Sequence, residues 1–509
     1  MIENMIKTID QWAQTTPTAV AYDELGTHYT YADLKRASDN IARYLDDLGL
    51  PTGAPVVVFG GQQFAMIASF LGTVKSGHAY IPVDTHSPND RLTMIAEIAE
   101  PAAIIAVDAL PVEVGDQPIL GGGTLASLLT APETAYDADH AVSGDQTYYI
   151  IFTSGTTGRP KGVQISHTNL LSYVNWMVSD DFKLPNRPVT MAQPPYSFDL
   201  SVMDWAPTLA LGGTLAALPK VVTDDFKRLF ETLPTMKLNV FVATPSFADI
   251  CLLEPTFDEE HLPDLTHFLF CGEELTVSTA TKLRERFPHA HIFNTYGPTE
   301  ATVAVTGVEI TDELIAAGRL PIGTVKADTT ITVVDDAGNS LPAGEQGEII
   351  ISGPSVSKGY LNNPEKTARA FFTEAGKAAY HSGDLGFLDE QGLLHYLGRI
   401  DFQIKLHGYR IELEEVNHYL NDNQWIKQAV AVPKYDADHK VSQMWAYVVP
   451  EETTEFTSDL QRTTAIKKSL KGVMMDYMVP NRFIYQESLP LTANGKVDIK
   501  TIIAEVNPA

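Results

Sequence analysis

A loop rich in hydroxyl groups and glycines, residues 152–162, has the composition of a phosphate-binding site. It follows the apolar run 148–152, and its glycines allow positive φ and close backbone approach to an anion. The residues that could hold phosphate are Thr153, Ser154, Gly155, Thr156, Thr157 and Lys161. Glycine follows Lys161, whereas the P-loop of kinases and ATPases requires Ser or Thr there. The loop therefore predicts phosphate binding of another kind; a solvated turn is the less favoured alternative.

Alternating helices and short strands must position this loop. Thr30 and Asp33 have the spacing of a capping box at the start of a helix that stops near Gly49. Strands are expected at 56–59, 80–83, 189–192, 240–243 and 292–294, and helices at 63–75, 168–178, 225–233 and 278–287. This alternation predicts an α/β fold with parallel-sheet subdomains.

The pattern changes twice towards the C-terminus. Short β runs at 331–334, 347–351 and 393–397 predict a small β-rich subdomain. After Asp401 the chain reads as a helix at 413–421, strands at 428–432 and 445–449, a helix at 460–475 and a strand near Phe483. We therefore expect a core domain over 1–400 and a small mobile α+β domain over 401–509.

Composition excludes several classes of protein. A chain of 509 residues is too long for one core, and its net charge of -28 argues against nucleic acid as a partner. Two cysteines, Cys251 and Cys271, cannot form a disulfide framework and suit a reducing compartment. The N-terminus has no signal-peptide pattern, and no run of about 18 apolar residues occurs. We expect a cytoplasmic protein that is not inserted in a membrane.

Six separated motifs occur in one order along nearly the whole chain. They are the loop 152–162, Tyr-Ser-Phe-Asp at 196–199, Asn-Thr-Tyr-Gly-Pro-Thr-Glu at 294–300, Ser-Gly-Asp at 382–384, Gly-Arg-Ile-Asp-Phe-Gln-Ile-Lys at 398–405 and Leu-Thr-Ala-Asn-Gly-Lys at 491–496. Together they resemble the adenylate-forming superfamily of acyl-CoA synthetases, luciferases and peptide-synthetase adenylation domains. The resemblance implies that a carboxylate attacks the α-phosphorus of ATP, giving an acyl-adenylate and pyrophosphate, and that a thiol then captures the acyl group.

The resemblance implies three key roles. Lys496, in an Asn-Gly turn, would be the catalytic lysine that reaches both the carboxylate and the α-phosphate. Glu300 would bind Mg²⁺, which favours one or two carboxylates together with substrate phosphates. Asp401 would be the hinge about which the small domain rotates between adenylation and thiolation. Without the other motifs, Lys496 would be read as a solvated lysine and Glu300 as an exposed glutamate.

Further ATP contacts follow from the same resemblance. Tyr296 would face adenine, Asp384 would accept the ribose hydroxyls, and Arg399 would contact ribose or phosphate. The remaining residues expected at the ATP site are Gly272, Glu273, Asn294, Thr295, Gly297, Pro298, Thr299 and Tyr396.

Asp199 follows Phe198 in an apolar stretch, where a carboxylate needs a partner. In amino-acid-activating relatives an aspartate here pairs with the substrate ammonium; capping of the next helix is the alternative. By the same resemblance, Cys271 and Val303 would also line the pocket that binds the carboxylic acid substrate. Lys496 would reach into this pocket as well. Cysteine is bulkier than the glycine or alanine of many relatives, so the pocket should be small.

Within the superfamily the chain looks most like members that activate D-alanine and load it on the phosphopantetheine thiol of a small, acidic D-alanyl carrier protein, for lipoteichoic acid modification. Lys467, Lys468 and Lys471 are candidates for a basic docking patch. Three alternatives stay open: another small amino-acid adenylating enzyme, a short-chain acyl-CoA synthetase, and a nucleotide-binding regulator without activity. Sequence does not decide between the enantiomers.

Overall fold

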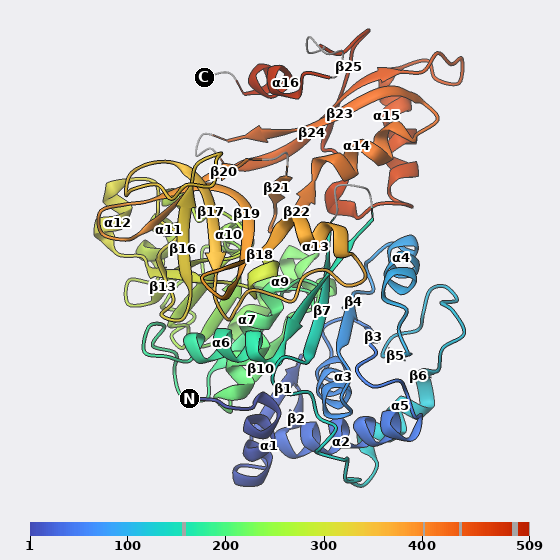
Figure 1. The fold of residues 1–509 in the computed structure, drawn as a ribbon, viewed down its shortest axis with the longest axis vertical. Coiled ribbons are helices and arrows are strands. Elements are labelled where there is room, and N and C mark those ends of the chain that lie inside the picture. The colour runs from blue at the N-terminus through green and yellow to red at the C-terminus, as the bar shows by residue number, and fades with distance from the viewer. Residues whose placement is uncertain (155–158, 401–402, 437–439, 491–496, 508–509) are drawn as a thin grey trace.

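The computed structural model describes residues 1–154, 159–400, 403–436, 440–490 and 497–507 (Figure 1). A large N-terminal α/β part contains three sheets, and a smaller C-terminal α+β part, orange to red in Figure 1, lies at one end of it. The expected fold class is confirmed.

The first sheet carries the phosphate loop. Its order is β6-β5-β3-β4-β7-β8, and all neighbours are parallel except β7 and β8. The strands are β3 (Val56–Phe59), β4 (Tyr80–Val83), β5 (Ala103–Ala106), β6 (Ile119–Gly121), β7 (Thr147–Thr153) and β8 (Lys161–Ser166). The helices of this region are α1 (Met5–Thr15), α2 (Tyr31–Asp47), α3 (Phe64–Lys75), α4 (Asn89–Ala99) and α5 (Gly122–Thr130).

The second sheet has the order β15-β14-β13-β12-β11-β9-β10-β1-β2, with a parallel centre and antiparallel edges. Its strands are β1 (Val20–Glu24), β2 (Thr27–Thr30), β9 (Val189–Ala192), β10 (Thr214–Ala217), β11 (Val240–Ala243), β12 (His267–Phe270), β13 (His291–Tyr296), β14 (Thr306–Glu309) and β15 (Thr324–Val325). The helices are α6 (His167–Met177), α7 (Leu200–Ala210), α8 (Lys220–Thr223), α9 (Phe226–Thr232), α10 (Pro245–Cys251), α11 (Val277–Arg286) and α12 (Asp312–Ala317), with short 3₁₀ turns η1 (Leu233–Thr235) and η2 (Thr299–Ala301).

The predicted β-rich subdomain is an antiparallel sheet. It consists of β16 (Thr330–Val334), β17 (Gly347–Ser352), β18 (Phe371–Glu374), β19 (Lys377–Leu388) and β20 (Leu394–Arg399), with helix α13 (Pro364–Ala370).

The C-terminal part begins with a hairpin, β21 (Gln403–Leu406) and β22 (Tyr409–Glu412). A three-stranded sheet follows, made of β23 (Ile426–Tyr435), β24 (Val441–Pro450) and β25 (Arg482–Tyr485). The helices are α14 (Leu413–Asn421), α15 (Asp459–Leu470) and α16 (Ile499–Val506), with the 3₁₀ turn η3 (Asp476–Met478). These elements bury their own apolar clusters, separate from those of the N-terminal part.

Local sequence signals explain many of these boundaries. Thr30 and Asp33 exchange both hydrogen bonds of the predicted capping box at the start of α2. The helix expected over 460–475 instead ends at Leu470, near Gly472, a residue that weakens helix interiors. The strand β8 and the hairpin β21–β22 were not expected.

Among the described residues, no helix has the length and apolarity needed to cross a bilayer.

Candidate active site

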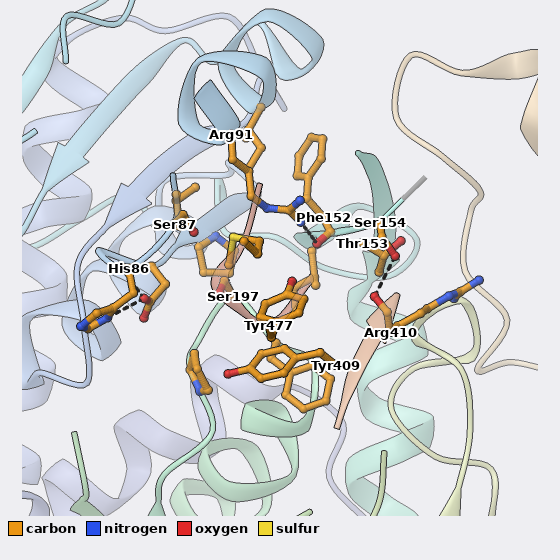
Figure 2. A pocket seen from close by; sticks show the side chains of 18 of the residues that line it. His86, Ser87, Arg91, Phe152, Thr153, Ser154, Ser197, Tyr409, Arg410 and Tyr477 are labelled. Carbon is orange, nitrogen blue, oxygen red and sulfur yellow. Dashed lines mark hydrogen bonds and ion pairs between the residues drawn. The ribbon is translucent and has the colours of Figure 1, made fainter. Parts of the chain in front are cut away.

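The phosphate loop connects two antiparallel strands. Thr153 pairs with Lys161 across the β7–β8 hairpin, so the sheet fixes both ends of the loop. Gly162 is needed here, because a Cβ atom would lie 2.9 Å from a neighbouring aromatic ring. Ser154 is buried, and its hydroxyl donates a hydrogen bond of 2.8 Å to the carbonyl oxygen of Arg410 in β22 (Figure 2). Three predicted loop residues lie outside the described residues: Gly155, Thr156 and Thr157.

Glu300, the expected metal ligand, is completely buried, and the alternative of an exposed glutamate is wrong. One carboxylate oxygen accepts a hydrogen bond from the Tyr360 hydroxyl at 2.8 Å, and the other lies 2.7 Å from Nη1 of Arg410. Burial alone would raise the pKa of Glu300, but the charges of Arg410 and Lys161 outweigh it and lower this pKa to about 2. Glu300 is therefore ionised at neutral pH.

An ionised carboxylate of this kind suits Mg²⁺ that is also held by a substrate. In the described part of the chain, no three His, Cys, Asp or Glu side chains gather into a metal cage. Mg²⁺ commonly binds through one or two carboxylates, with water and phosphate oxygens completing its shell. The residues thus fit an ion shared between Glu300 and a nucleotide.

Lys161 supplies a buried positive charge beside Glu300. Its Nζ lies 3.6 Å from Glu412 and 5.3 Å from the centre of the Tyr360 ring. Burial lowers the pKa of Lys161, and the nearby Arg410 lowers it further, whereas Glu300 and Glu412 oppose the change. Lys161 therefore needs negative neighbours, and phosphate oxygens would supply them.

The residues expected around adenine and ribose form one connected group. The Tyr296 hydroxyl donates to Asp384 at 2.5 Å, and Arg399 pairs with the other Asp384 oxygen at 2.9 Å. The Tyr396 ring lies 6.2 Å from the Tyr296 ring, and the Nζ of Lys405 lies 5.7 Å from the centre of the same Tyr296 ring. Asp384 is buried within β19, so the alternative of a turn aspartate is wrong. Arg399 is mostly buried, so the alternative of a surface arginine is wrong too.

Other residues of the expected ATP site form hydrogen bonds that hold neighbouring backbone segments in place. The side chains of Asn294 and Thr295 each donate a hydrogen bond of 2.8 Å to a backbone carbonyl. Glu273 accepts a hydrogen bond of 2.5 Å from the backbone N–H of Gly408 in the β21–β22 hairpin. Four further predicted residues line one cavity with Asp384 and Arg399: Gly272, Gly297, Pro298 and Thr299.

This cavity measures about 40 Å³ and also has Asp199, Cys271 and Val303 in its wall. The structure therefore brings the three expected acid-pocket residues together. A cavity volume of about 10–15 Å³ holds one water molecule, so this cavity has room for roughly three groups of the size of a water molecule or a methyl group. A long acyl chain would not fit.

Asp199 is a buried carboxylate without a capping role. It precedes α7, yet its side chain makes no capping hydrogen bond, so the helix-cap alternative is not supported. Burial raises the pKa of Asp199 to about 6, although a hydrogen bond from Thr299 and the charge of Lys405 partly oppose the shift. A cationic ligand would therefore stabilise the ionised form.

The wall of the same cavity contains an unusual backbone turn at Val303. Thr302 and Val303 have φ of 60° and 66°, values that β-branched residues rarely adopt. The Ala304 N–H donates to the Thr302 carbonyl at 2.8 Å, which closes a three-residue turn around Val303. The carbonyl of Val303 accepts a hydrogen bond from the Cys271 thiol at 3.7 Å. Strain at a cavity wall is typical of functional sites.

Sequence reasoning missed the hairpin residues at this site. Lys405, Gly408 and Arg410 all line the cavity. Arg410 and Glu412 stand at alternate positions, which indicates a strand with one charged face. The residues that contact this face lie far away in the chain, so no local pattern identifies them. Asp401 and Lys496 lie outside the described residues, so the hinge and the catalytic lysine stay predictions.

Comparison with known proteins shows the family of this chain. The family described as "AMP-binding enzyme" matches residues 9–361, and "AMP-binding enzyme C-terminal domain" matches residues 415–496. A relative from Lactiplantibacillus plantarum, named "D-alanine--D-alanyl carrier protein ligase", is 66% identical over 509 residues, which is 100% of each chain. A relative of the same name from Streptococcus agalactiae serotype V is 58% identical over 511 residues, again 100% of each chain.

Solved structures share the fold at lower identity. The amide bond synthetase McbA from Marinactinospora thermotolerans matches with a TM-score of 0.85 and 22% identity, covering 99% of this chain and 100% of that one. The Vibrio cholerae adenylation domain AlmE, in complex with glycyl-adenosine-5'-phosphate, matches with a TM-score of 0.81 and 23% identity, covering 99% and 98%. The chain belongs to the AMP-binding enzyme family, in the group whose relatives are named D-alanine--D-alanyl carrier protein ligase.

Proposed function

We propose that this chain activates D-alanine with ATP to D-alanyl-AMP and pyrophosphate, and then transfers D-alanine to the phosphopantetheine thiol of a D-alanyl carrier protein, for lipoteichoic acid modification. The full-length relatives of that name support the substrate and the partner. The observation that carries the proposal is the Asp199 carboxylate in the wall of a cavity of about 40 Å³. Such a site can pair with an α-ammonium group and has room for a methyl side chain.

In the first step a carboxylate oxygen of D-alanine bonds to the α-phosphorus of ATP, and the bond from that phosphorus to pyrophosphate breaks. Asp199 would hold the ammonium group, while Ser154 and Lys161 would hold phosphate oxygens. Glu300 would hold Mg²⁺, which when bound would neutralise part of the polyphosphate charge. Tyr296, Asp384 and Arg399 would place the nucleoside, and Lys496 would approach the reacting oxygens.

In the second step the carrier thiol attacks the carbonyl carbon, its proton is released, and AMP leaves. An apolar cavity of about 370 Å³ would admit the pantetheine arm. The hairpin residues His407 and Tyr409 line it, and it shares the lining residues Phe198 and Leu200 with the substrate cavity. We place the hinge for the change between the two steps at Asp401, between domains of residues 1–400 and 401–509.

Carrier docking and location follow as parts of the proposal. Lys468 is exposed on α15, whereas the Nζ of Lys467 donates to a backbone carbonyl at 2.8 Å. The candidate docking patch for an acidic carrier consists of these two lysines and Lys471. Cytoplasm is the proposed location, because ATP is available there and both cysteines are free thiols.

Carrier loading tests the proposal. Purified protein, ATP, Mg²⁺ and D-alanine are incubated with the phosphopantetheinylated carrier, and the intact mass of the carrier is measured. We expect the mass of one alanyl group to be added, and no addition to carrier that lacks phosphopantetheine. An unchanged mass with an active, modified carrier would contradict the transfer step.

Use of D-alanine should weaken in acid because burial raises the pKa of Asp199. Its pKa is raised to about 6, so the carboxyl is protonated and neutral below that pH and cannot pair with an ammonium group. We expect the KM for D-alanine to rise about tenfold per pH unit below pH 6. Steady-state kinetics from pH 5 to 8 measure this, with Asp199→Asn as the control. The same acidic rise in the Asn variant would assign it to another group.

Cys271→Ala should widen the range of side chains accepted. The thiol lies in the wall of the small cavity, so its removal makes room for one more methylene group. We expect the kcat/KM for D-2-aminobutyrate, relative to D-alanine, to rise about tenfold. Cys251→Ala is the matched control, because Cys251 is buried in α10 and does not line this cavity. An unchanged ratio in Cys271→Ala would exclude the thiol as a size filter.

A further inference from the structure

The backbone segment 354–356, which follows β17, lies behind the strained turn at Thr302 and Val303. Its three successive carbonyl groups each accept a hydrogen bond from a buried side chain. Asn169, in α6, donates to the first and the third carbonyl at 2.7 and 3.0 Å, and the Thr302 hydroxyl donates to the second, that of Ser355, at 2.7 Å. Thr302 is therefore attached to a segment that α6 already holds.

Further hydrogen bonds fix this segment on both sides. The backbone N–H of Ser357 donates to the carbonyl of Glu300 at 2.8 Å, just before the turn. On the other side, the hydroxyl of Ser355 lies 3.1 Å from that of Ser172, which also accepts a hydrogen bond from the buried Lys326. The segment thus gives the Thr302 hydroxyl a fixed acceptor.

The hydrogen bond of Thr302 acts on backbone that is unfavourable by itself. Thr302 and Val303 have φ of 60° and 66°, and such values persist in β-branched residues only where surrounding contacts impose them. The turn places Val303 in the wall of the substrate cavity, where its carbonyl accepts the hydrogen bond of the Cys271 thiol. Thr302 is not one of the described residues that line this cavity, so it can act on a substrate only through Val303.

We infer that Thr302 is a positioning residue for the choice of substrate: the hydrogen bond from its hydroxyl to Ser355 holds Val303 against Cys271 and so fixes the width of the pocket. This inference deepens the proposed function and rests on it for the substrate, a small amino acid. A fixed wall rejects a larger side chain because it cannot move outwards. Without the hydrogen bond the turn relaxes, and an additional methylene group is accepted.

Thr306 separates this role from a general contribution to stability. It lies in β14, four positions after Thr302, and is also completely buried. Its hydroxyl donates to the backbone carbonyl of Ile322 at 2.5 Å. Removal of either hydroxyl deprives a buried carbonyl of its donor, so both losses should destabilise the fold to a similar extent. Only the hydroxyl of Thr302 belongs to the turn that forms the cavity wall.

Substrate selectivity is the first test. It is measured by pyrophosphate exchange as the kcat/KM for D-2-aminobutyrate relative to D-alanine. We expect this ratio to rise about fivefold in Thr302→Ala, the effect of one hydrogen bond, with the KM for ATP unchanged. Thr302→Val removes the hydroxyl but keeps the size of the side chain and should agree, whereas Thr302→Ser should restore the original ratio. Thr306→Ala should lower the Tm as much as Thr302→Ala without changing the ratio.

The reactivity of Cys271 is a second readout that needs no substrate. The protein is treated with iodoacetamide, and alkylation of Cys271 and Cys251, two buried free thiols, is followed by peptide mass spectrometry. Cys251 reports general opening of the fold. We expect the rate at Cys271 relative to Cys251 to rise about fivefold in Thr302→Ala, because the thiol loses its fixed acceptor, and to stay unchanged in Thr302→Ser and Thr306→Ala.

The inference is overturned if either readout is unchanged in both Thr302→Ala and Thr302→Val. It is equally overturned if Thr306→Ala or Thr302→Ser shifts the readouts as much as Thr302→Ala does, because the cause would then be general loosening or loss of the methyl group. Failure of the unchanged protein to exchange pyrophosphate with D-alanine would refute the proposed substrate. The alkylation result would still decide whether Thr302 holds the wall.

Discussion

Lys496→Ala is expected to abolish measurable adenylate formation while leaving ATP binding nearly unchanged. In the resemblance to adenylate-forming enzymes, this lysine contacts the carboxylate and the α-phosphate while negative charge concentrates between them. Loss of one positioned donor at such a centre costs about 10²–10³ in kcat, and a full positive charge should cost at least as much. D-alanine-dependent pyrophosphate exchange measures the loss, and ATP binding is measured by calorimetry.

Lys500→Ala is the matched control for this variant. Lys500 is an exposed lysine in α16, four positions further along the chain, and its removal should leave exchange unchanged. Exchange in Lys496→Ala within a few-fold of the unchanged protein would refute the catalytic assignment. A parallel loss of ATP binding would instead indicate a role in holding the nucleotide.

Asp199→Ala should have the second largest effect, and it should fall on one substrate. Removal of one partner from a buried charge pair costs about 2–5 kcal/mol, which corresponds to at least about 30-fold in affinity. We expect the KM for D-alanine to rise by that factor or more and the KM for ATP to change little. Asp199→Asn keeps the shape and tests the charge alone. Equal losses for both substrates would contradict pairing with the ammonium group.

Much of the fold could be predicted because its signals are local. The strands at 56–59, 80–83, 189–192 and 240–243 have the expected bounds, since short apolar runs between turns favour buried parallel strands. The capping box at Thr30 and Asp33 is likewise a contact within one turn. The strand β8 was missed because it lies directly after the phosphate loop and mixes Lys161, Gly162 and Gln164 among apolar residues.

The candidate site could be predicted only in part. Asp199, Cys271 and Val303 were expected to share a pocket, and they line one cavity. The partners of Glu300 were not expected, because Tyr360 and Arg410 lie 60 and 110 positions away in the chain. No local pattern encodes which face of a hairpin will meet which loop. The positive φ of Val303 could not be predicted from the sequence either, because no neighbouring residue is typical of a turn of this kind.

The most direct test of the central claim is pyrophosphate exchange measured with D-alanine, L-alanine, glycine and acetate at equal concentrations. The cavity and Asp199 predict strong exchange with D-alanine and little with acetate, which has no ammonium group for Asp199 to pair with. Exchange with acetate as fast as with D-alanine, or no acid-dependent exchange at all, would contradict the account.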